Sequence, residues 1–200
     1  MCNRSTINAC NETNFGHLGF GWLGARTSCS SSRWRRPTRC VHEARDQTMD
    51  VRAKLAEIGL ELPIAAKPVA AYVPAIRTGN LIFTAGQLPL VNGAMSVTGK
   101  IGDKVSIEQG KELAQVCALN CLAAVQTVCD VNKIVKIVRV VGYVNGISGF
   151  TSQPAVVNGA SELFLNIWGE SGKHARSAIG VAELPLDASV EVELTVEVRD

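Results

Sequence analysis

Two side chains near the C-terminus, Arg176 and Glu191, could together carry out chemistry on a small carboxylic acid. The planar guanidinium of an arginine binds a carboxylate through two parallel hydrogen bonds and stays charged when partly buried. A glutamate in a half-dry cleft can act as general acid and base, above all where burial raises its pKa. The local pattern leaves alternatives open, because Arg176 could form a structural salt bridge and Glu193 and Glu197 share the alternating segment with Glu191. We expect the arginine and the catalytic carboxylate to lie on neighbouring strands.

Three sequence blocks surround these two residues. They are residues 71–73 with 79–89, Val157 with Asn158, and residues 175–181 followed by Leu184-Pro185 and Glu191. In this order they resemble the RidA family of enamine/imine deaminases over roughly residues 55–198. The resemblance implies an α+β fold of the chorismate-mutase-like type, with a mixed six-stranded sheet and two helices packed on one face. It also implies a homotrimer whose active sites lie between subunits.

The resemblance also assigns roles to individual residues. Arg176 would hold the substrate carboxylate, and Glu191, fifteen positions later, would activate water. The other expected substrate-binding positions are Tyr72, Ala85, Asn158 and Ala178. Tyr72 would form the pocket wall, and the backbone carbonyl of Ala178 would face the substrate nitrogen. No metal or cofactor is implied.

The chain departs from the family pattern at two places. Ala85 stands where many members have a serine, so one pocket hydroxyl is missing. Lys173-His174-Ala175 replaces the more usual Phe-Pro-Ala before the arginine. We expect His174 to be an exposed loop histidine, with a place at the pocket rim as the alternative.

The secondary-structure signals follow the order ββ-α-β-α-ββ. Asp50 favours a short capped helix that ends at Gly59, Ser106 with Gln109 predicts a capping box, and Ser152 with Pro154 opens the last helix. The expected strands are 72–76, 81–86, 135–144, 176–181 and 189–198, and residues 90–104 are expected to form a loop. The apolar segment 135–144 is typical of a central strand buried on both faces. Segment 189–198 alternates polar and apolar residues, so one face of the sheet should be partly polar and suit a subunit interface or a water-filled cleft.

Composition divides the chain into an N-terminal extension, residues 1–48, and a RidA-like domain, residues 49–200. The first 48 residues hold seven arginines and three acidic residues, so the remainder of this chain of net charge +2 is slightly acidic. The extension is expected to be disordered or to resemble an organelle transit peptide. A near-neutral domain is a poor partner for nucleic acid, and no apolar run is long enough for a membrane span. We therefore expect a cytoplasmic protein, or an organellar one if the extension is a transit peptide.

The seven cysteines fall into a set in the extension and a set in the predicted helix after Ser106. Cys117 and Cys121 share one helical face, which is compatible with a metal or redox pair. No histidine or further cysteine has the matching spacing, so we interpret both as small buried apolar residues.

Three functions are compatible with these observations. The first is hydrolytic deamination of reactive 2-enamino or 2-imino acids, of the 2-aminoacrylate type, to 2-keto acids and ammonia. The second is a non-catalytic regulatory trimer that binds a small metabolite through the same arginine. The third is an endoribonuclease or translation inhibitor, which the near-neutral charge and the scarcity of histidines disfavour.

Overall fold

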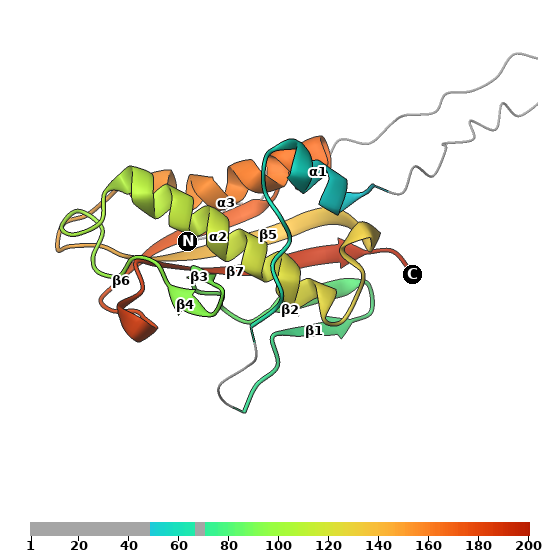
Figure 1. Cartoon of the computed structure of the whole chain (residues 1–200), viewed down its shortest axis with the longest axis horizontal. Coiled ribbons are helices and arrows are strands. Elements are labelled where there is room, and N and C mark those ends of the chain that lie inside the picture. The colour runs from blue at the N-terminus through green and yellow to red at the C-terminus, as the bar shows by residue number, and fades with distance from the viewer. Residues whose placement is uncertain (1–48, 67–70) are drawn as a thin grey trace, which may run out of the picture. The chain divides into compact units, whose positions relative to one another are not determined.

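The computed structural model describes residues 49–66 and 71–200, which form an α+β fold around one mixed sheet. Its five strands are β1 (Ala75–Thr78), β2 (Leu81–Thr84), β5 (Ile134–Asn145), β6 (Ala175–Val181) and β7 (Val190–Val198). They lie in the order β1-β2-β7-β5-β6 (Figure 1). Only β5 and β6 are parallel, because the chain crosses between them through a helix, and the other pairs are antiparallel. The long C-terminal strand β7 therefore occupies the middle of the sheet.

The expectation of a six-stranded sheet is wrong, because the main sheet of the described residues has five strands. The segment expected to be a loop contains two further strands, β3 (Leu90–Val91) and β4 (Ala94–Met95), which pair only with each other. Asn92 and Gly93 join them with φ values of 52° and 80°. Two consecutive residues with positive φ make the tight turn that favours a hairpin, so this short pair closes on itself.

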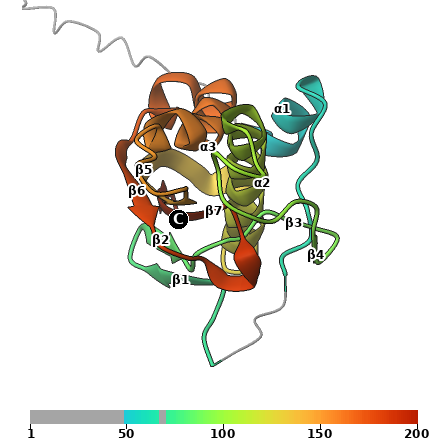
Figure 2. The same cartoon turned by 90° about the vertical axis from the view of Figure 1, so that its left-hand side faces the viewer.

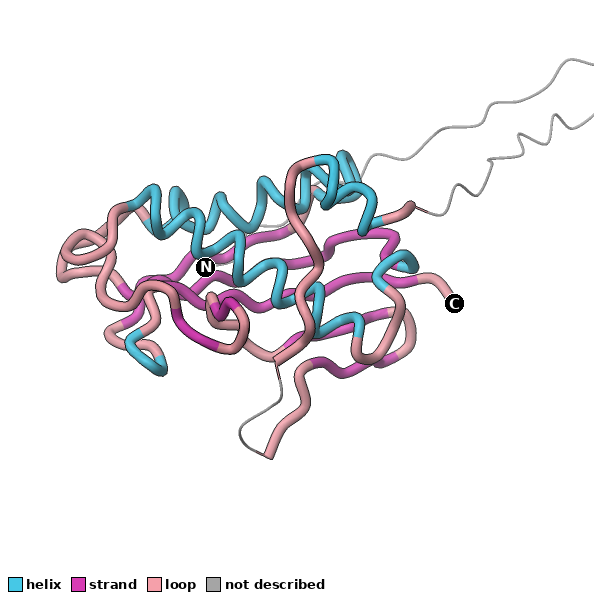
Figure 3. Tube along the Cα trace, viewed as in Figure 1, coloured by secondary structure: helices cyan, strands magenta, loops and turns pink. Residues whose placement is uncertain are grey.

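Two long helices, α2 (Ile107–Gln126) and α3 (Gln153–Trp168), pack side by side on one face of the sheet (Figures 2 and 3). The predicted capping box of α2 is confirmed, with Ser106 and Gln109 bonding each other's backbone N–H groups. The two helices approach closely at Gly159, where an added Cβ would overlap the backbone carbonyl of Lys111. A short helix, α1 (Val51–Glu57), is capped by Asp50 as predicted. Three 3-10 turns, η1 (Val131–Lys133), η2 (Gly169–Gly172) and η3 (Pro185–Asp187), connect the remaining elements.

Strand β7 shows the expected alternation. Its residues on the helix side are buried, namely Val190, Val192, Leu194, Val196 and Val198. Its residues on the other side, including Glu191, are only half-buried. The sheet therefore has one face covered by α2 and α3 and one face that the described residues leave open.

Two strand expectations need adjustment. The first strand begins at Ala75 rather than at Tyr72, because Tyr72 lies in a bend before Pro74. Strand β5 is paired on both sides, but it is buried on both faces only in its second half, from Val140 onward. Val135 and Arg139, in its first half, are exposed, and Arg139 pairs with Thr195 of the open face.

The expectations for the N-terminal extension concern residues outside those that the structure describes. Among the described helices, none combines the length and the apolar character needed to cross a bilayer.

Candidate functional site

Arg176 lies near the start of β6, at the edge of the sheet, with its side chain on the helix-covered face. It pairs in register with Val140, which is buried beneath the helices, and neighbouring residues of paired strands point to the same face. One terminal nitrogen, Nη1, donates to Asn158 Oδ1 at 2.7 Å and to Ser161 Oγ at 3.1 Å. Both partners are on α3, so the helix fixes one end of the guanidinium.

The rest of the guanidinium remains available to a ligand. Nη1 donates both of its hydrogens to acceptors on α3, which leaves three N–H groups on Nε and Nη2. Within the described part of the chain, no carboxylate forms an ion pair with Arg176. The alternative of a salt bridge to a strand glutamate is therefore not realised there. The free Nε and Nη2 edge is the geometry that binds a carboxylate through two hydrogen bonds.

Glu191 lies near the start of β7 on the open face of the sheet. It stands opposite Tyr143 in register, and its carboxylate covers Gly86, where an added Cβ would overlap Oε1. Partial burial raises the pKa of Glu191, and the charge of Glu193 raises it further. Glu193 itself accepts a hydrogen bond from the Tyr143 hydroxyl at 3.3 Å. A carboxyl with a raised pKa is better suited to exchange protons near neutral pH.

Arg176 and Glu191 do not meet within one chain, which corrects the expectation of neighbouring strands. Strand β5 separates β6 from β7, and two strand spacings amount to about 10 Å. Arg176 also points to the helix side, whereas Glu191 points to the open side. The reason is topological: the β5–α3–β6 crossover places β6 outside β5, and β7 returns on the other side of β5. Each chain therefore holds the two candidate groups at separate places, which we call candidate half-sites.

The other expected residues divide between these half-sites. Asn158 contacts Arg176, and Ala178 lies two residues farther along β6, opposite Gly142. Ala85 precedes Gly86 beside Glu191, and its N–H donates to Pro74 O at 2.9 Å. Tyr72 lies shortly before β1, and half of its surface is accessible. The structure thus brings Asn158 to the arginine, and it places Gly86, the residue after Ala85, against the glutamate.

Ser161 was not predicted as part of the site, and His174 was expected at the pocket rim only as the alternative. Ser161 accepts the second Nη1 hydrogen bond, and its hydroxyl lies 3.0 Å from His174 Nε2. The expectation that His174 is an exposed loop histidine is wrong, because its ring packs edge-on against Phe164 at 6.0 Å. Ser161 could have been found from its helical spacing, since it stands three residues after Asn158 on the same face.

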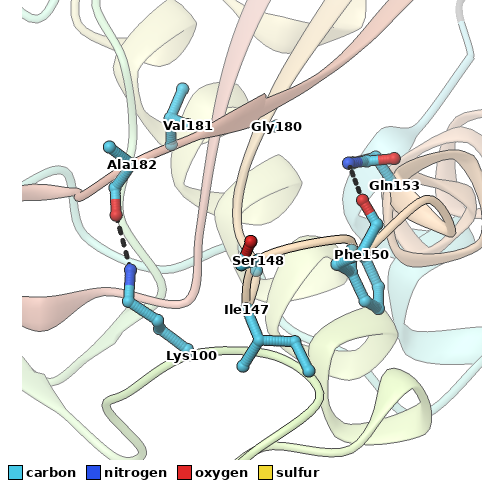
Figure 4. A pocket seen from close by; sticks show the side chains of 9 residues that line it. Lys100, Ile147, Ser148, Phe150, Gln153, Gly180, Val181 and Ala182 are labelled. Atoms are coloured by element: carbon cyan, nitrogen blue, oxygen red, sulfur yellow. Dashed lines mark hydrogen bonds between the residues drawn. The ribbon is translucent and has the colours of Figure 1, made fainter.

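A separate pocket of about 400 Å³ lies at the other end of β6 (Figure 4). Lys100, Phe150, Gln153 and Gly180 line it, and none of the expected site residues does. The Lys100 ammonium is already engaged, because it donates to Asn145 Oδ1 at 2.7 Å and to the Ala182 carbonyl. It also forms an ion pair with Glu183 at 3.3 Å. In this arrangement Lys100 ties two loops together.

The cysteine interpretation is confirmed for the predicted helix. Cys117 and Cys121 are fully buried and donate weak hydrogen bonds to the backbone carbonyls of Val190 and Val192. Burial raises the pKa of Cys121 to about 12, so its thiol stays protonated. Among the described residues, no group of three histidine, cysteine or acidic side chains is arranged to hold a metal ion.

The fold and the two half-sites define a class of protein: a chorismate-mutase-like α+β domain with an edge-strand arginine and a half-buried glutamate. Residues 52–198 match the family described as "YjgF/chorismate_mutase-like, putative endoribonuclease". The chain belongs to this YjgF family, of which the RidA proteins are members, and the resemblance found in the sequence is confirmed.

Individual relatives have different names. The chain is 38% identical over 152 residues to protein TCP17 of Trypanosoma cruzi, covering 75% of this chain and 95% of the relative. It is 31% identical over 145 residues to a 2-iminobutanoate/2-iminopropanoate deaminase of Dermatophagoides farinae, covering 70% and 95%. Among solved structures, protein Atu1372 of Agrobacterium tumefaciens, of unknown function, has a TM-score of 0.70 and 40% identity. That alignment covers 74% of this chain and 92% of the other.

Proposed function

We propose that this protein hydrolyses reactive 2-enamino and 2-imino acids to 2-keto acids and ammonia. The observation that carries this proposal is the Arg176 guanidinium, held at one end by α3 and open at the Nε and Nη2 edge. A small carboxylate is the ligand that such an edge recognises best. The resemblance to a relative named as an imine deaminase supports the choice of substrate class.

In the proposed reaction, Arg176 binds the substrate carboxylate and the carbonyl of Ala178 accepts a hydrogen bond from the substrate nitrogen. Glu191 takes a proton from a water molecule as the water oxygen bonds to the imine carbon. The protonated Glu191 then returns this proton to the nitrogen of the carbinolamine. Glu191 next takes the remaining hydroxyl proton of the carbinolamine and passes it to the same nitrogen, so that the carbon–nitrogen bond breaks, ammonia leaves, the carbon–oxygen double bond of the keto acid forms, and the Glu191 carboxylate is regenerated. Positioning and charge neutralisation suffice because such imines also hydrolyse without a catalyst.

The two half-sites lead us to propose that the active unit is a homotrimer. Strands β1 and β6 are the two edges of the sheet, and an uncovered edge is a natural place for another chain to pack. The open face also exposes the large apolar side chain of Phe83, which pairs in register with Thr195. A neighbouring chain could therefore bring its Glu191 and Ala85 to the Arg176 and Asn158 of the first. Tyr72 would complete the pocket wall.

The activity is tested with full-length protein and an amino-acid oxidase that generates imino acids in the presence of semicarbazide. Wild type should suppress semicarbazone formation, and Arg176→Ala and Glu191→Gln should not. The matched control is Glu197→Gln, a glutamate on the same face of β7, which should behave like wild type. If Glu197→Gln were inactive and Glu191→Gln active, the assignment of the acid–base residue would be wrong.

The shared site has its own test. Co-expressed Arg176→Ala and Glu191→Gln chains should assemble at random, so that each mixed trimer has one site with both intact residues and about a quarter of all sites are intact. Mixing should therefore restore about a quarter of the wild-type activity, although each variant alone is inactive. No recovery in trimers shown to be mixed would refute a site built from two chains.

A second candidate function is a regulatory trimer that binds a keto acid without turnover. The absence of a hydroxyl at Ala85 favours it, and Glu191 with its raised pKa favours catalysis. Saturable binding of 2-oxobutanoate without imine hydrolysis would support the regulatory function. An endoribonuclease activity needs a cationic surface, which the slightly acidic residues 49–200 do not favour. We place the protein in the cytoplasm, or in an organelle if residues 1–48 act as a transit peptide.

A further inference from the structure

A chain of hydrogen bonds runs from the candidate carboxylate-binding arginine into the protein. Arg176 Nη1 donates to Ser161 Oγ at 3.1 Å, and Ser161 Oγ lies 3.0 Å from His174 Nε2. His174 Nδ1 lies 2.7 Å from the carbonyl oxygen of Gly172. The imidazole also packs edge-on against Phe164, with an interplanar angle of 87°. Helix α3, the turn after it and β6 are thus linked through one histidine.

The carbonyl partner of His174 shows that Nδ1 carries a hydrogen. A carbonyl oxygen can only accept, so His174 Nδ1 carries the hydrogen and donates to Gly172. Ser161 Oγ accepts from Arg176, so its own hydroxyl hydrogen is free to donate to His174 Nε2. In the neutral Nδ1–H form, Nε2 is left to accept the hydrogen of Ser161, whereas an imidazolium would donate from Nε2 to Ser161 Oγ.

The surroundings of His174 favour this neutral form. Burial lowers the pKa of His174, and the charge of Arg176 lowers it further, against an opposing effect of the hydrogen bond to Gly172. Lys136, Lys173 and Glu197 line an open cavity beside the ring. An unprotonated Nε2 is required if it is to accept the hydrogen of Ser161.

We propose that His174 is a positioning residue that orients Ser161 as a hydrogen-bond acceptor and thereby holds the Arg176 guanidinium for carboxylate binding. Asn158 holds the same Nη1 nitrogen through its second hydrogen, so two acceptors from α3 fix the plane of the guanidinium. Ser161 is only 8% exposed, which leaves its hydroxyl little freedom to find other partners. Without Nε2, the hydroxyl would be free to rotate and to point its hydrogen at the guanidinium. The role in catalysis depends on the proposed deaminase function, but the role in carboxylate binding does not.

The test is a double-mutant cycle on full-length protein, with 2-oxobutanoate as the binding probe and imine hydrolysis as the kinetic readout. His174→Ala should weaken 2-oxobutanoate binding and raise KM by about fivefold, the effect of one neutral hydrogen bond, with kcat nearly unchanged. Ser161→Ala should have a similar effect, and the double variant should be no worse than Ser161→Ala. His174→Gln, whose amide oxygen can replace Nε2 as an acceptor, should restore most of the affinity. Lys173→Ala, next to the histidine but outside the hydrogen-bond chain, should behave like wild type.

Nitrogen NMR of the wild-type imidazole provides a readout that does not depend on activity. At neutral pH it should show the Nδ1–H tautomer, and Ser161→Ala should raise the pKa of His174 by removing a donor to the neutral form. An Nε2–H tautomer, or additive effects of Ser161→Ala and His174→Ala, would overturn the proposal. If imine hydrolysis is absent while the cycle holds for 2-oxobutanoate binding, the deaminase function fails and the positioning role stands. If hydrolysis depends on Arg176 but the cycle is additive, the positioning role fails alone.

Discussion

Replacement of Arg176 by lysine tests how the guanidinium is shared between the protein and its ligand. The arginine commits Nη1 to Asn158 and Ser161 and keeps three N–H groups for a carboxylate. A lysine ammonium has three hydrogens, so the same two acceptors would leave only one. The ligand would lose one of two charge-assisted hydrogen bonds, which costs about 1.5–3 kcal/mol, or about 10- to 160-fold in affinity.

The assay is calorimetric titration of 2-oxobutanoate, followed by steady-state kinetics with an imino acid. The carboxylate is bound equally in the substrate and the transition state, so Arg176→Lys should raise KM and leave kcat nearly unchanged. Arg52→Lys, on the exposed surface of α1, is the matched control and should bind like wild type. A dissociation constant of Arg176→Lys for 2-oxobutanoate within threefold of wild type would refute carboxylate binding through two hydrogen bonds.

Three further predictions concern stability and reactivity. Glu191→Gln should stabilise the protein at neutral pH while abolishing hydrolysis, as measured by urea denaturation and the semicarbazide assay. The raised pKa of Glu191 means that its contribution to stability is greatest below its ordinary pKa of 4.5 and is lost as pH rises through the raised value. The stability advantage of Glu191→Gln over wild type should therefore disappear near pH 4. Equal unfolding free energies of the variant and wild type at neutral pH would contradict this prediction. Gly159→Ala should cost about 3 kcal/mol of unfolding free energy, because α2 and α3 must separate at Lys111, whereas Asn166→Ala on the exposed side of α3 should cost less than about 1 kcal/mol. In native protein, peptide mapping after iodoacetamide should find Cys117 and Cys121 unmodified, because both thiols are buried with raised pKa values. Their rapid labelling would show that α2 opens more readily than its packing indicates.

Much of the fold could be predicted because its signals are local. The capping box at Ser106 depends on residues three positions apart, and the alternation along β7 depends on residues two apart. The hairpin β3–β4 was missed because each strand has only two residues, too few for any period to show. The composition of residues 72–76 favours a strand, but Pro74 interrupts its first half and β1 begins at Ala75.

The candidate site was less accessible to sequence reasoning. Arg176 was found from its motif. Its hydrogen bond to Asn158 agrees with the family resemblance, which places both residues at the substrate-binding site. The contact between Ser161 and His174 was missed because a histidine in the short connection between η2 and β6 gives no sign of the direction of its ring. Only the packing against Phe164 decides that direction.

The sequence by itself determined the helices, most strands and the residue types that can grip a carboxylate and move a proton. The tertiary structure decided that Arg176 and Glu191 are separated by β5 and face opposite sides of the sheet. The physical reason is that strand order arises from long-range pairing and from the crossover through α3, whereas caps and alternation arise from neighbours along the chain. The same distinction explains why residues fifteen positions apart in the sequence form two half-sites rather than one.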